Sequence, residues 1–218
     1  MREKNGASFL SILRRDLVVP GVWDPHAYRG QKTRTLAEYI NAARVGHSGV
    51  ASADLTPIEY RYLHGRNVPT FAFDESGDET GHRFPSVGES CLLFGTMRAY
   101  LGNALVTPKG TWIGRESSVR FPVKSEFVCV EPHDDLRYFW WAFLQSSTFL
   151  RSLPVGSGGT RPRLPPEHLL STSVRVPGNA ERERLDHAIR GFAEREWREY
   201  VAIKRMLASA LDGDDLRP

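Results

Sequence analysis

The chain has 218 residues, of which 40% are hydrophobic, 25% charged and 11% aromatic. This composition is typical of a soluble globular protein that buries a sizeable core in one domain, with or without an extension. The formal net charge of +3 is compatible with nucleic-acid binding but does not establish it. The sequence has no apolar run long enough to cross a bilayer, so we expect a cytoplasmic protein with no membrane partner.

The first part of the chain predicts two short helices and a loop-rich stretch. Ser8 can cap a helix over residues 8–17, which carry an apolar stripe. Residues 35–43 predict a second helix. Residues 45–88 are rich in loop signals and include a helical turn at 57–63 and an acidic turn at 74–79.

The centre of the chain predicts β-strands. Short apolar runs separated by turn residues occur at residues 90–94, 104–106, 119–121 and 127–130. Cys91 and Cys129 lie in two of these runs. Two cysteines are too few for a disulfide framework, so we expect buried thiols in a reducing compartment.

A helix rich in aromatic residues follows the strands. Asp134 and Asp135 can cap it, and it runs to about residue 153. Its aromatic side chains are interpreted as core, with a base-stacking platform as the alternative: Tyr138, Phe139, Trp140, Trp141, Phe143 and Phe149.

Residues 155–164 form a glycine-rich, basic segment with the sequence V-G-S-G-G-T-R-P-R-L. Its three glycines leave the backbone almost unconstrained, and the prolines at its end stiffen the exit. The segment lies in the only part of the chain with a basic excess. Residues 91–177 hold 10 basic and 6 acidic residues, against 11 and 11 in residues 1–90 and 7 and 7 in residues 178–212. A helical turn at 166–170 and a strand at 173–176 come next.

The last segment predicts a long helix that Asn179 can cap, with Gly191 as a point of local irregularity. At 1.5 Å per residue it is roughly 50 Å long, more than a small domain covers alone. Its apolar stripe therefore predicts a partner helix from another chain or from the N-terminus; the alternative is packing on its own domain. The predicted dimerisation residues are Leu185, Ile189, Phe192, Tyr200, Ile203, Leu207 and Leu211.

Signatures of catalysis are largely missing from the sequence. It has no phosphate loop, no nucleophile elbow and no glycine-rich cofactor loop after a strand. Its seven histidines are scattered, and none pairs with a cysteine or another histidine at zinc-ligand spacing. We therefore predict no catalytic residue, no metal site and no cofactor.

The order of these elements resembles a target-recognition domain of the specificity (S) subunit of type I restriction-modification systems. Residues 87–89 and 98–103 match a block that precedes the centre of that domain. Residues 158–164, Leu169 and residues 174–177 match the glycine-containing loop, the short helix and the V-x-[VL]-P segment that lead into the spacer helix. The resemblance covers about residues 35–211.

The chain departs from the family in two ways. The family's Pro-x-x-Glu-Gln segment is replaced by P-G-N-A-E-R at residues 177–182, which weakens the expected methyltransferase contact there. A full S subunit has two recognition domains and two spacer helices, whereas this chain resembles a half-subunit. The resemblance implies an α+β fold with a mixed, β-rich centre and a long coiled-coil-like helix at its C-terminal end. Its expected parts are a DNA-binding domain over residues 1–177, a spacer helix over 178–212 and a tail over 213–218.

The resemblance implies a non-catalytic, sequence-specific DNA reader in phage defence. Its expected partners are double-stranded DNA, a DNA methyltransferase (M) subunit, a restriction subunit, and either a second copy or a second half-subunit. Arginines can fork onto guanine or phosphate, hydroxyls can bond phosphates or base edges, and further cations supply charge without sequence preference. The predicted DNA-binding residues are Thr96, Arg98, Lys109, Arg115, Arg120, Lys124, Ser157, Gly158, Gly159, Thr160, Arg161 and Arg163.

Two other functional classes stay open at this point. One is a stand-alone nuclease or toxin whose active site has unrecognised spacing. The other is a protein-interaction module that uses the long helix and does not touch nucleic acid. DNA cleavage with added Mg²⁺ would indicate the first class, and no DNA binding at low salt would indicate the second.

Overall fold

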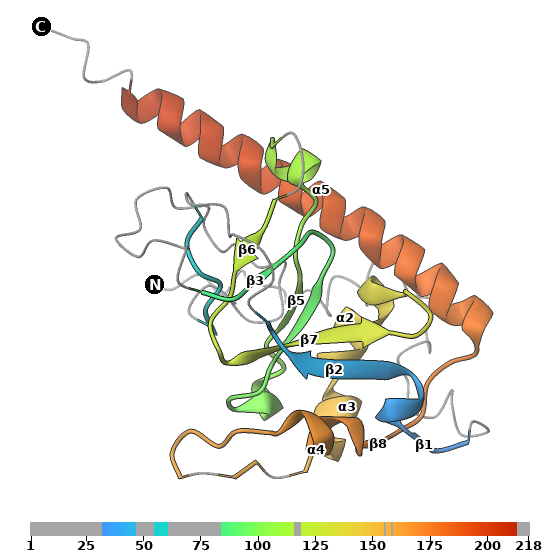
Figure 1. Ribbon diagram of the computed structural model, residues 1–218. Coiled ribbons are helices and arrows are strands. Elements are labelled where there is room, and N and C mark those ends of the chain that lie inside the picture. The colour runs from blue at the N-terminus through green and yellow to red at the C-terminus, as the bar shows by residue number, and fades with distance from the viewer. Residues whose placement is uncertain are drawn as a thin grey trace, which may run out of the picture.

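The computed structural model describes residues 32–46, 55–60, 84–115, 119–154, 156–157 and 159–212. Several predictions from the sequence lie outside these residues: the helix at 8–17, the acidic turn at 74–79, most of the helical turn at 57–63, Gly158, and the tail at 213–218. Figure 1 shows a sheet and short helices packed together, with one long helix crossing the domain.

A four-stranded antiparallel sheet forms the centre of the domain, in the order β2-β7-β4-β5. Its strands are β2 (Ile40–Arg44), β7 (Phe127–Pro132), β4 (Leu92–Gly95) and β5 (Ala104–Val106). Two small antiparallel pairs accompany it: β1 (Arg34–Thr35) with β8 (Ser173–Val174), and β3 (Ser86–Val87) with β6 (Phe121–Pro122). The predicted α+β class is confirmed. The four predicted strands are also present, with shifts of one or two residues at some ends: three form β4, β5 and β7 of the central sheet, and the run at 119–121 forms β6 of a small pair.

The helix predicted at residues 35–43 is wrong. Thr35 begins a short 3₁₀ turn, η2 (Leu36–Glu38), whose first turn is closed by a capping box between Thr35 and Glu38. The chain then extends as β2, because each residue from Ile40 to Arg44 pairs with β7. A strand partner almost ninety positions further along the sequence outweighs the local helical pattern.

The aromatic segment forms two helices, α2 (Arg137–Leu144) and α3 (Ser147–Ser152), where the sequence predicted one. The chain turns at Ser146, which has extended backbone angles and accepts a hydrogen bond from the Phe149 amide at 3.2 Å. Nearly all of α2 is buried, and α2 packs against β4, β5 and β7. The interpretation of the aromatic residues as core is confirmed, because all six are buried.

The predicted caps of α2 are also corrected. Asp135 adopts a left-handed conformation with φ of 57°, and no side chain of the preceding residues caps the helix in the usual way. The cap comes from the C-terminal helix, where Asp186 Oδ1 accepts hydrogen bonds from the amides of Tyr138 at 2.8 Å and Phe139 at 3.0 Å. Asp134 instead accepts from the Trp140 indole at 2.9 Å.

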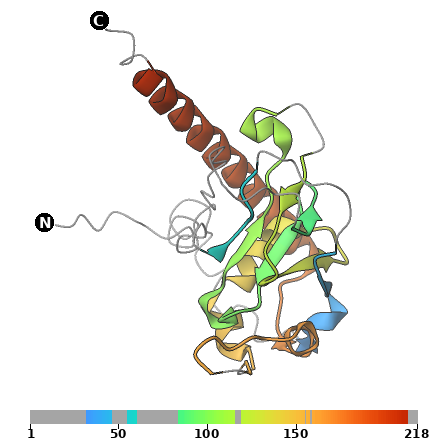
Figure 2. The ribbon, with the colours of Figure 1, turned by 60° about the vertical axis from the view of Figure 1, so that its left-hand side comes forward.

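The long helix α5 (Asn179–Asp212) is confirmed over 34 residues and is continuous through Gly191, so the predicted irregularity is absent there. It follows α4 (Pro166–Leu170) and β8, as the sequence predicted. A salt bridge of 3.0 Å between Arg182 and Asp134 joins its first turn to the start of α2. Both ribbon views show its far end extending past the sheet (Figure 1 and Figure 2).

The apolar stripe of α5 divides into two parts. Its first part packs against α2 and against η6 (Gly110–Ile113) of the same chain, and Leu185 and Ile189 are buried there. These two residues are therefore core residues of this domain, which corrects their predicted role in dimerisation. Phe192 and Tyr200 are partly buried against the same core. Ile203 is 52% exposed, and the side chains of Leu207 and Leu211 lie outside the described structure.

Candidate nucleic-acid interface

The glycine-rich segment forms a narrow hairpin. Ser157 and Arg163 pair in antiparallel fashion through two backbone hydrogen bonds, from the Arg163 amide to the Ser157 carbonyl at 2.8 Å and from the Ser157 amide to the Arg163 carbonyl at 3.0 Å. The turn between them carries Gly159, Thr160 and Arg161. Backbone hydrogen bonds between Ser157 and Arg163 therefore hold the two ends of this turn together.

The hairpin is fastened to the residues that follow β4. The Leu164 amide donates to the Thr96 carbonyl at 2.9 Å, and the Arg98 amide donates to the Pro162 carbonyl at 2.8 Å. Between these bonds, Met97 and Arg163 form a β-bridge. The hairpin therefore extends the hydrogen bonding beyond the end of β4, an inner strand of the sheet, and this strand sets its position.

A buried tyrosine braces this junction from behind. The Tyr60 hydroxyl accepts from the Met97 amide at 2.9 Å and donates to the Glu126 carbonyl at 3.0 Å. Burial raises the pKa of Tyr60 well above its ordinary value, so this hydroxyl keeps its proton. No local pattern predicts this role, because Tyr60 is distant in the chain from the residues that it positions.

Two glycines permit close approach at this junction. A Cβ at Gly95 would lie 2.6 Å from the Tyr60 ring, and a Cβ at Gly156 would lie 2.9 Å from the Arg163 carbonyl oxygen. Gly156 is therefore needed for contact between the two sides of the hairpin. The sequence predicted that the loop glycines make the backbone flexible; at Gly156 the glycine instead makes room for the Arg163 backbone.

The hairpin and the turn after Met97 together present an exposed polar surface, which we call the hairpin surface. Its members are Arg98, Ser157, Gly159, Thr160, Arg161 and Arg163. Arg98 has a left-handed backbone with φ of 50°, and its guanidinium donates to the Thr160 carbonyl at 3.3 Å. Among the described residues, none of the three arginines takes part in a salt bridge. Their charges are therefore available to an anionic partner.

An apolar hollow lies beside the hairpin surface. It measures about 190 Å³ and lies between η5 (Ala99–Leu101), the end of α3 and the hairpin, with Leu150, Leu164 and Pro162 in its wall. Tyr100 also lines it and is 57% exposed, which removes a core role for this residue, and the neighbouring Leu101 is 48% exposed. Arginines around an apolar hollow suit a ligand that has both charged and flat apolar parts.

The other residues predicted to bind DNA are not on this surface. Thr96 is buried, and its hydroxyl donates to the Glu126 carbonyl at 2.9 Å, so it supports the surface from within. Lys124 forms a salt bridge of 2.7 Å with Glu59. The Arg120 guanidinium donates to both the hydroxyl and the carbonyl of Ser86. These contacts give the three residues structural roles that the sequence did not predict.

Lys109 and Arg115 flank η6, at the other end of the domain. The Lys109 ammonium lies 6.0 Å from the centre of the Trp112 ring, and the Arg115 amide donates to the Gly110 carbonyl at 2.9 Å. In both ribbon views η6 lies at the end nearer to the C-terminal part of α5, whereas η5 and the hairpin lie at the opposite end (Figure 1 and Figure 2). The predicted set is therefore divided, and only its glycine-rich and Arg98 members come together.

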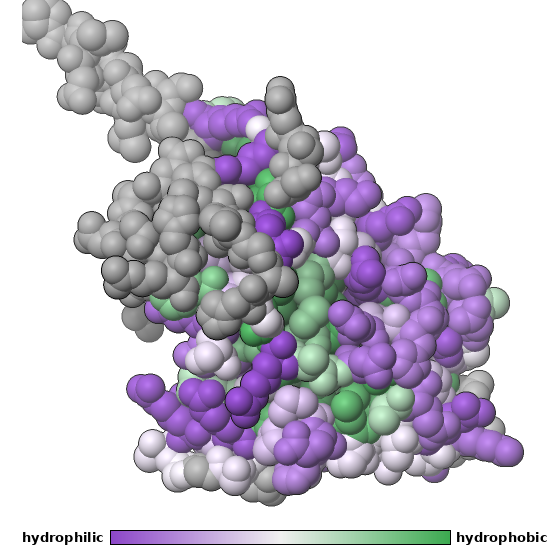
Figure 3. All heavy atoms as spheres, viewed as in Figure 1, coloured by the Kyte–Doolittle hydropathy of each residue, from purple (hydrophilic) through white to green (hydrophobic). Residues whose placement is uncertain are grey.

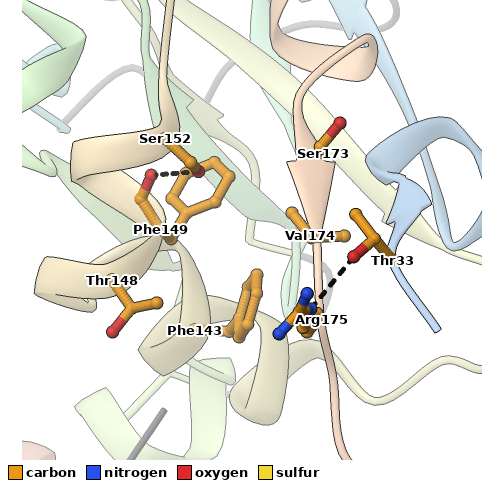
Figure 4. A pocket seen from close by; sticks show the side chains of 8 residues that line it. All are labelled: Thr33, Phe143, Thr148, Phe149, Ser152, Ser173, Val174 and Arg175. Carbon is orange, nitrogen blue, oxygen red and sulfur yellow. Dashed lines mark hydrogen bonds between the residues drawn. The ribbon is translucent and has the colours of Figure 1, made fainter. Parts of the chain in front are cut away.

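A second hollow, of about 330 Å³, lies between α3 and β8 (Figure 4). Phe143 and Phe149 form its apolar wall, and the Arg175 guanidinium at its side donates to the Thr33 hydroxyl at 2.9 Å. The surface over the sheet combines a central apolar area with a largely hydrophilic surround (Figure 3).

In the described parts of the chain, no group of three or more His, Cys, Asp or Glu side chains is arranged to hold a metal ion. None of the described helices is both long and apolar enough to cross a membrane.

Comparison with known proteins gives matches among solved structures. No family model matches the chain, and no curated protein matches it. A structure described as showing complex assembly and conformational transition of the type I restriction-modification system matches with 14% identity and a TM-score of 0.42. The HsdS subunit from Thermoanaerobacter tengcongensis matches with 13% identity and a TM-score of 0.40.

The two matches cover 84% and 82% of this chain but 42% and 40% of the matched chains. This chain therefore spans less than half the length of either one.

Proposed function

We propose that this chain is a DNA-reading specificity subunit with a single recognition domain, which directs an adenine methyltransferase and its restriction complex to a target sequence. The hairpin surface carries this proposal. Three exposed arginines, which form no salt bridge with any described residue, lie together on a hairpin and on the segment after β4 to which the hairpin is hydrogen-bonded. A rigid frame with free cations favours reading of one DNA geometry, because little ordering is needed on binding.

The chemistry of the surface suits both parts of DNA recognition. Arg161 and Arg163 can each present a planar fork to the O6 and N7 atoms of guanine or to a phosphate. Ser157, Thr160 and the backbone amides at the turn can bond phosphate oxygens, which sets the register of the protein on the duplex. On this proposal the chain contributes binding alone, and its partner subunits carry out methylation and cleavage.

The proposed assembly uses the part of α5 beyond Tyr200. Ile203 and Met206 are 52% and 64% exposed there. Exposed apolar side chains on a helix that extends past its own domain favour pairing with another helix. The partner is a second copy or a second half-subunit, and the pair would present two recognition domains to a bipartite DNA target.

A methylome comparison tests the proposed function directly. Long-read sequencing of the host genome with and without this gene should reveal an adenine-methylated bipartite motif that depends on the gene. A motif with two identical, inverted halves would indicate a homodimer, and two different halves a heterodimer. An unchanged methylome would contradict the methylation role.

DNA binding by purified protein tests the hairpin surface. The double substitution Arg161→Ala and Arg163→Ala should weaken binding at least about tenfold at fixed salt, because each good arginine contact is worth about 1–3 kcal/mol. It should also make the affinity less dependent on salt. The measurement is a titration of labelled DNA by fluorescence anisotropy at several salt concentrations.

A matched control removes the same charge from α5. Arg184 and Arg198 are both exposed and form salt bridges with Glu181 and Glu194. Replacing both with alanine lowers the net charge by the same amount and should leave DNA affinity nearly unchanged. Equal losses for the two double variants would mean that net charge, not the hairpin surface, determines binding.

A further inference from the structure

The two cysteines of the chain lie against each other on the central strands. Cys129 belongs to β7, and Cys91 directly precedes β4. Because Leu93 is the register partner of Cys129, Cys91 and Cys129 are diagonal neighbours on one face of the sheet. Their sulfur atoms are 3.0 Å apart, which is about 1 Å more than the length of a disulfide bond.

The backbone fixes both thiols where they are. Hydrogen bonds between β4 and β7 hold Cys129 in place. Three hydrogen bonds that involve Thr107 hold the turn around Cys91. The Cys91 amide donates to the Thr107 hydroxyl at 2.8 Å, the Thr107 amide donates to the Cys91 carbonyl at 2.9 Å, and the Thr107 hydroxyl donates to the Gly88 carbonyl at 2.8 Å. The two sulfurs therefore stay close together without side-chain ordering during a reaction.

The two thiols also differ in acidity, so one is suited to attack a peroxide and the other to form the disulfide afterwards. A hydrogen bond from Cys91 lowers the pKa of Cys129, and the same contact, with burial, raises the pKa of Cys91. Both residues are half-buried, so a small oxidant can approach them. Thiolate character and access are the two properties that make a cysteine sensitive to oxidation.

We propose that Cys91 and Cys129 are a redox modification site, at which a hydroperoxide produces a reversible intramolecular disulfide across β4 and β7. The Cys129 thiolate attacks one peroxide oxygen, the O–O bond breaks, and the other oxygen takes up a proton and leaves as water or alcohol. The Cys91 sulfur then attacks the sulfenic acid, the S–O bond breaks, and the released hydroxide leaves with the Cys91 proton as water. The two sulfurs lose two electrons in total, which the peroxide gains.

The position of the pair favours a disulfide that is easily reduced. Diagonal neighbours on antiparallel strands have Cα atoms about 7–8 Å apart, at or beyond the upper limit for an unstrained disulfide. Strained and accessible disulfides have more oxidising potentials and are reduced by small thiols. The bond should therefore form under oxidative stress and be lost in a reducing cytoplasm. This inference does not depend on DNA binding.

Titration with hydrogen peroxide tests the proposal on the full chain. The reduced protein is exposed to increasing peroxide, quenched with acid, alkylated with N-ethylmaleimide and measured by intact mass spectrometry. The form that takes up two alkyl groups should be replaced by one that takes up none and is lighter by two hydrogen atoms. Dithiothreitol should restore the first form. The proposal would be overturned if the protein took up two alkyl groups at every peroxide concentration below that producing sulfinic acid. Disulfide-linked dimers in place of the monomer would also overturn it.

Single variants test the order of attack. In Cys91→Ser the reaction should stop at a sulfenic acid on Cys129, which dimedone traps. In Cys129→Ser the remaining thiol should react more slowly with peroxide, because burial still raises the pKa of Cys91. Equal rates for the two variants would overturn the assignment of Cys129 as the attacking group. The oxidised wild-type protein should keep the circular dichroism spectrum of the reduced protein; loss of that spectrum on oxidation would show that the bond forms only in unfolded chains.

Discussion

The two parts of α5 have similar apolar patterns and different surroundings. Up to Trp197, the stripe is covered by α2 and η6 of the same chain, and Leu185, Ile189, Ala193 and Trp197 are each less than 5% exposed. Beyond Val201, which still packs against the core, Ile203 and Met206 are largely exposed. A helical stripe alone thus cannot distinguish a core from an interface. The covered and exposed parts of the stripe differ only in whether other elements of the domain pack against them.

The largest expected effect belongs to the covered part. Trp197 is 2% exposed, so Trp197→Ala should lower the free energy of unfolding by about 3–5 kcal/mol through lost burial and the cavity that it leaves. Met206→Ala is the matched control on the exposed part and should change it by less than about 0.5 kcal/mol. Urea denaturation followed by circular dichroism measures both. Similar losses for the two variants would contradict the division of the helix.

A smaller effect is expected from the carboxylate that joins the covered part of α5 to α2. Asp186→Ala leaves the amides of Tyr138 and Phe139 without their acceptor and should lower the free energy of unfolding by about 1–3 kcal/mol. Asp186→Asn keeps a side-chain oxygen at this position and should cost less. The difference between the two variants in urea denaturation measures the cap itself.

The same residue predicts a dependence on pH. Burial raises the pKa of Asp186 above its ordinary value of 3.8, and the negative charge of Asp134 raises it further. The two amides and Arg190 favour the charged form, but their effect on the pKa is smaller. The folded state therefore holds this proton more tightly than the unfolded state does. The contribution of Asp186 to stability is greatest below pH 3.8 and falls as pH rises through the folded pKa. Unfolding measured from pH 3 to 7 in the wild type and in Asp186→Asn isolates this contribution: the stability of the wild type relative to the variant should fall as pH rises.

Gly191 offers a change of opposite sign in the covered part. It lies inside a continuous helix, and an added Cβ would meet only the Arg195 guanidinium, at 3.9 Å. Gly191→Ala should therefore raise the free energy of unfolding by about 0.5–1 kcal/mol, since alanine loses less conformational freedom in a helix. A decrease in the same denaturation assay would mean that the helix is irregular at this residue, as the sequence first suggested.

Local patterns in the sequence were sufficient for elements whose contacts are local or whose side chains are all buried. The run at 104–106 forms β5, and the aromatic residues of α2 are core, because apolar side chains packed on both sides need no particular partner to be buried. In contrast, β2 depends on pairing with β7, and the cap of α2 depends on Asp186, which is 48 residues away from Tyr138. No local pattern encodes either contact.

The same limit explains the division of the predicted DNA-binding residues. Arg161 and Arg163 share one short segment with glycines and prolines, which predicts their shared role, and that segment is a hairpin at the surface. Lys124 looks similar as a basic residue in the central segment, but Glu59 neutralises it at 2.7 Å. Composition and order indicate where cations gather along the chain, and only tertiary contacts decide which of them remain unpaired.

The smallest expected effect on folding, and the sharpest test of assembly, lies at the exposed part of α5. Ile203→Glu should leave the free energy of unfolding of the monomer within about 0.5 kcal/mol, because this side chain is half exposed already. On a pairing face, however, it places a charge in an apolar interface and should convert a dimer into a monomer in light scattering. Ala202→Glu adds the same charge at an exposed neighbouring position outside the stripe and should preserve the dimer. A wild-type chain that is monomeric at all concentrations would contradict homodimer pairing and leave a second half-subunit as the partner, since the exposed stripe would then need a different helix to cover it.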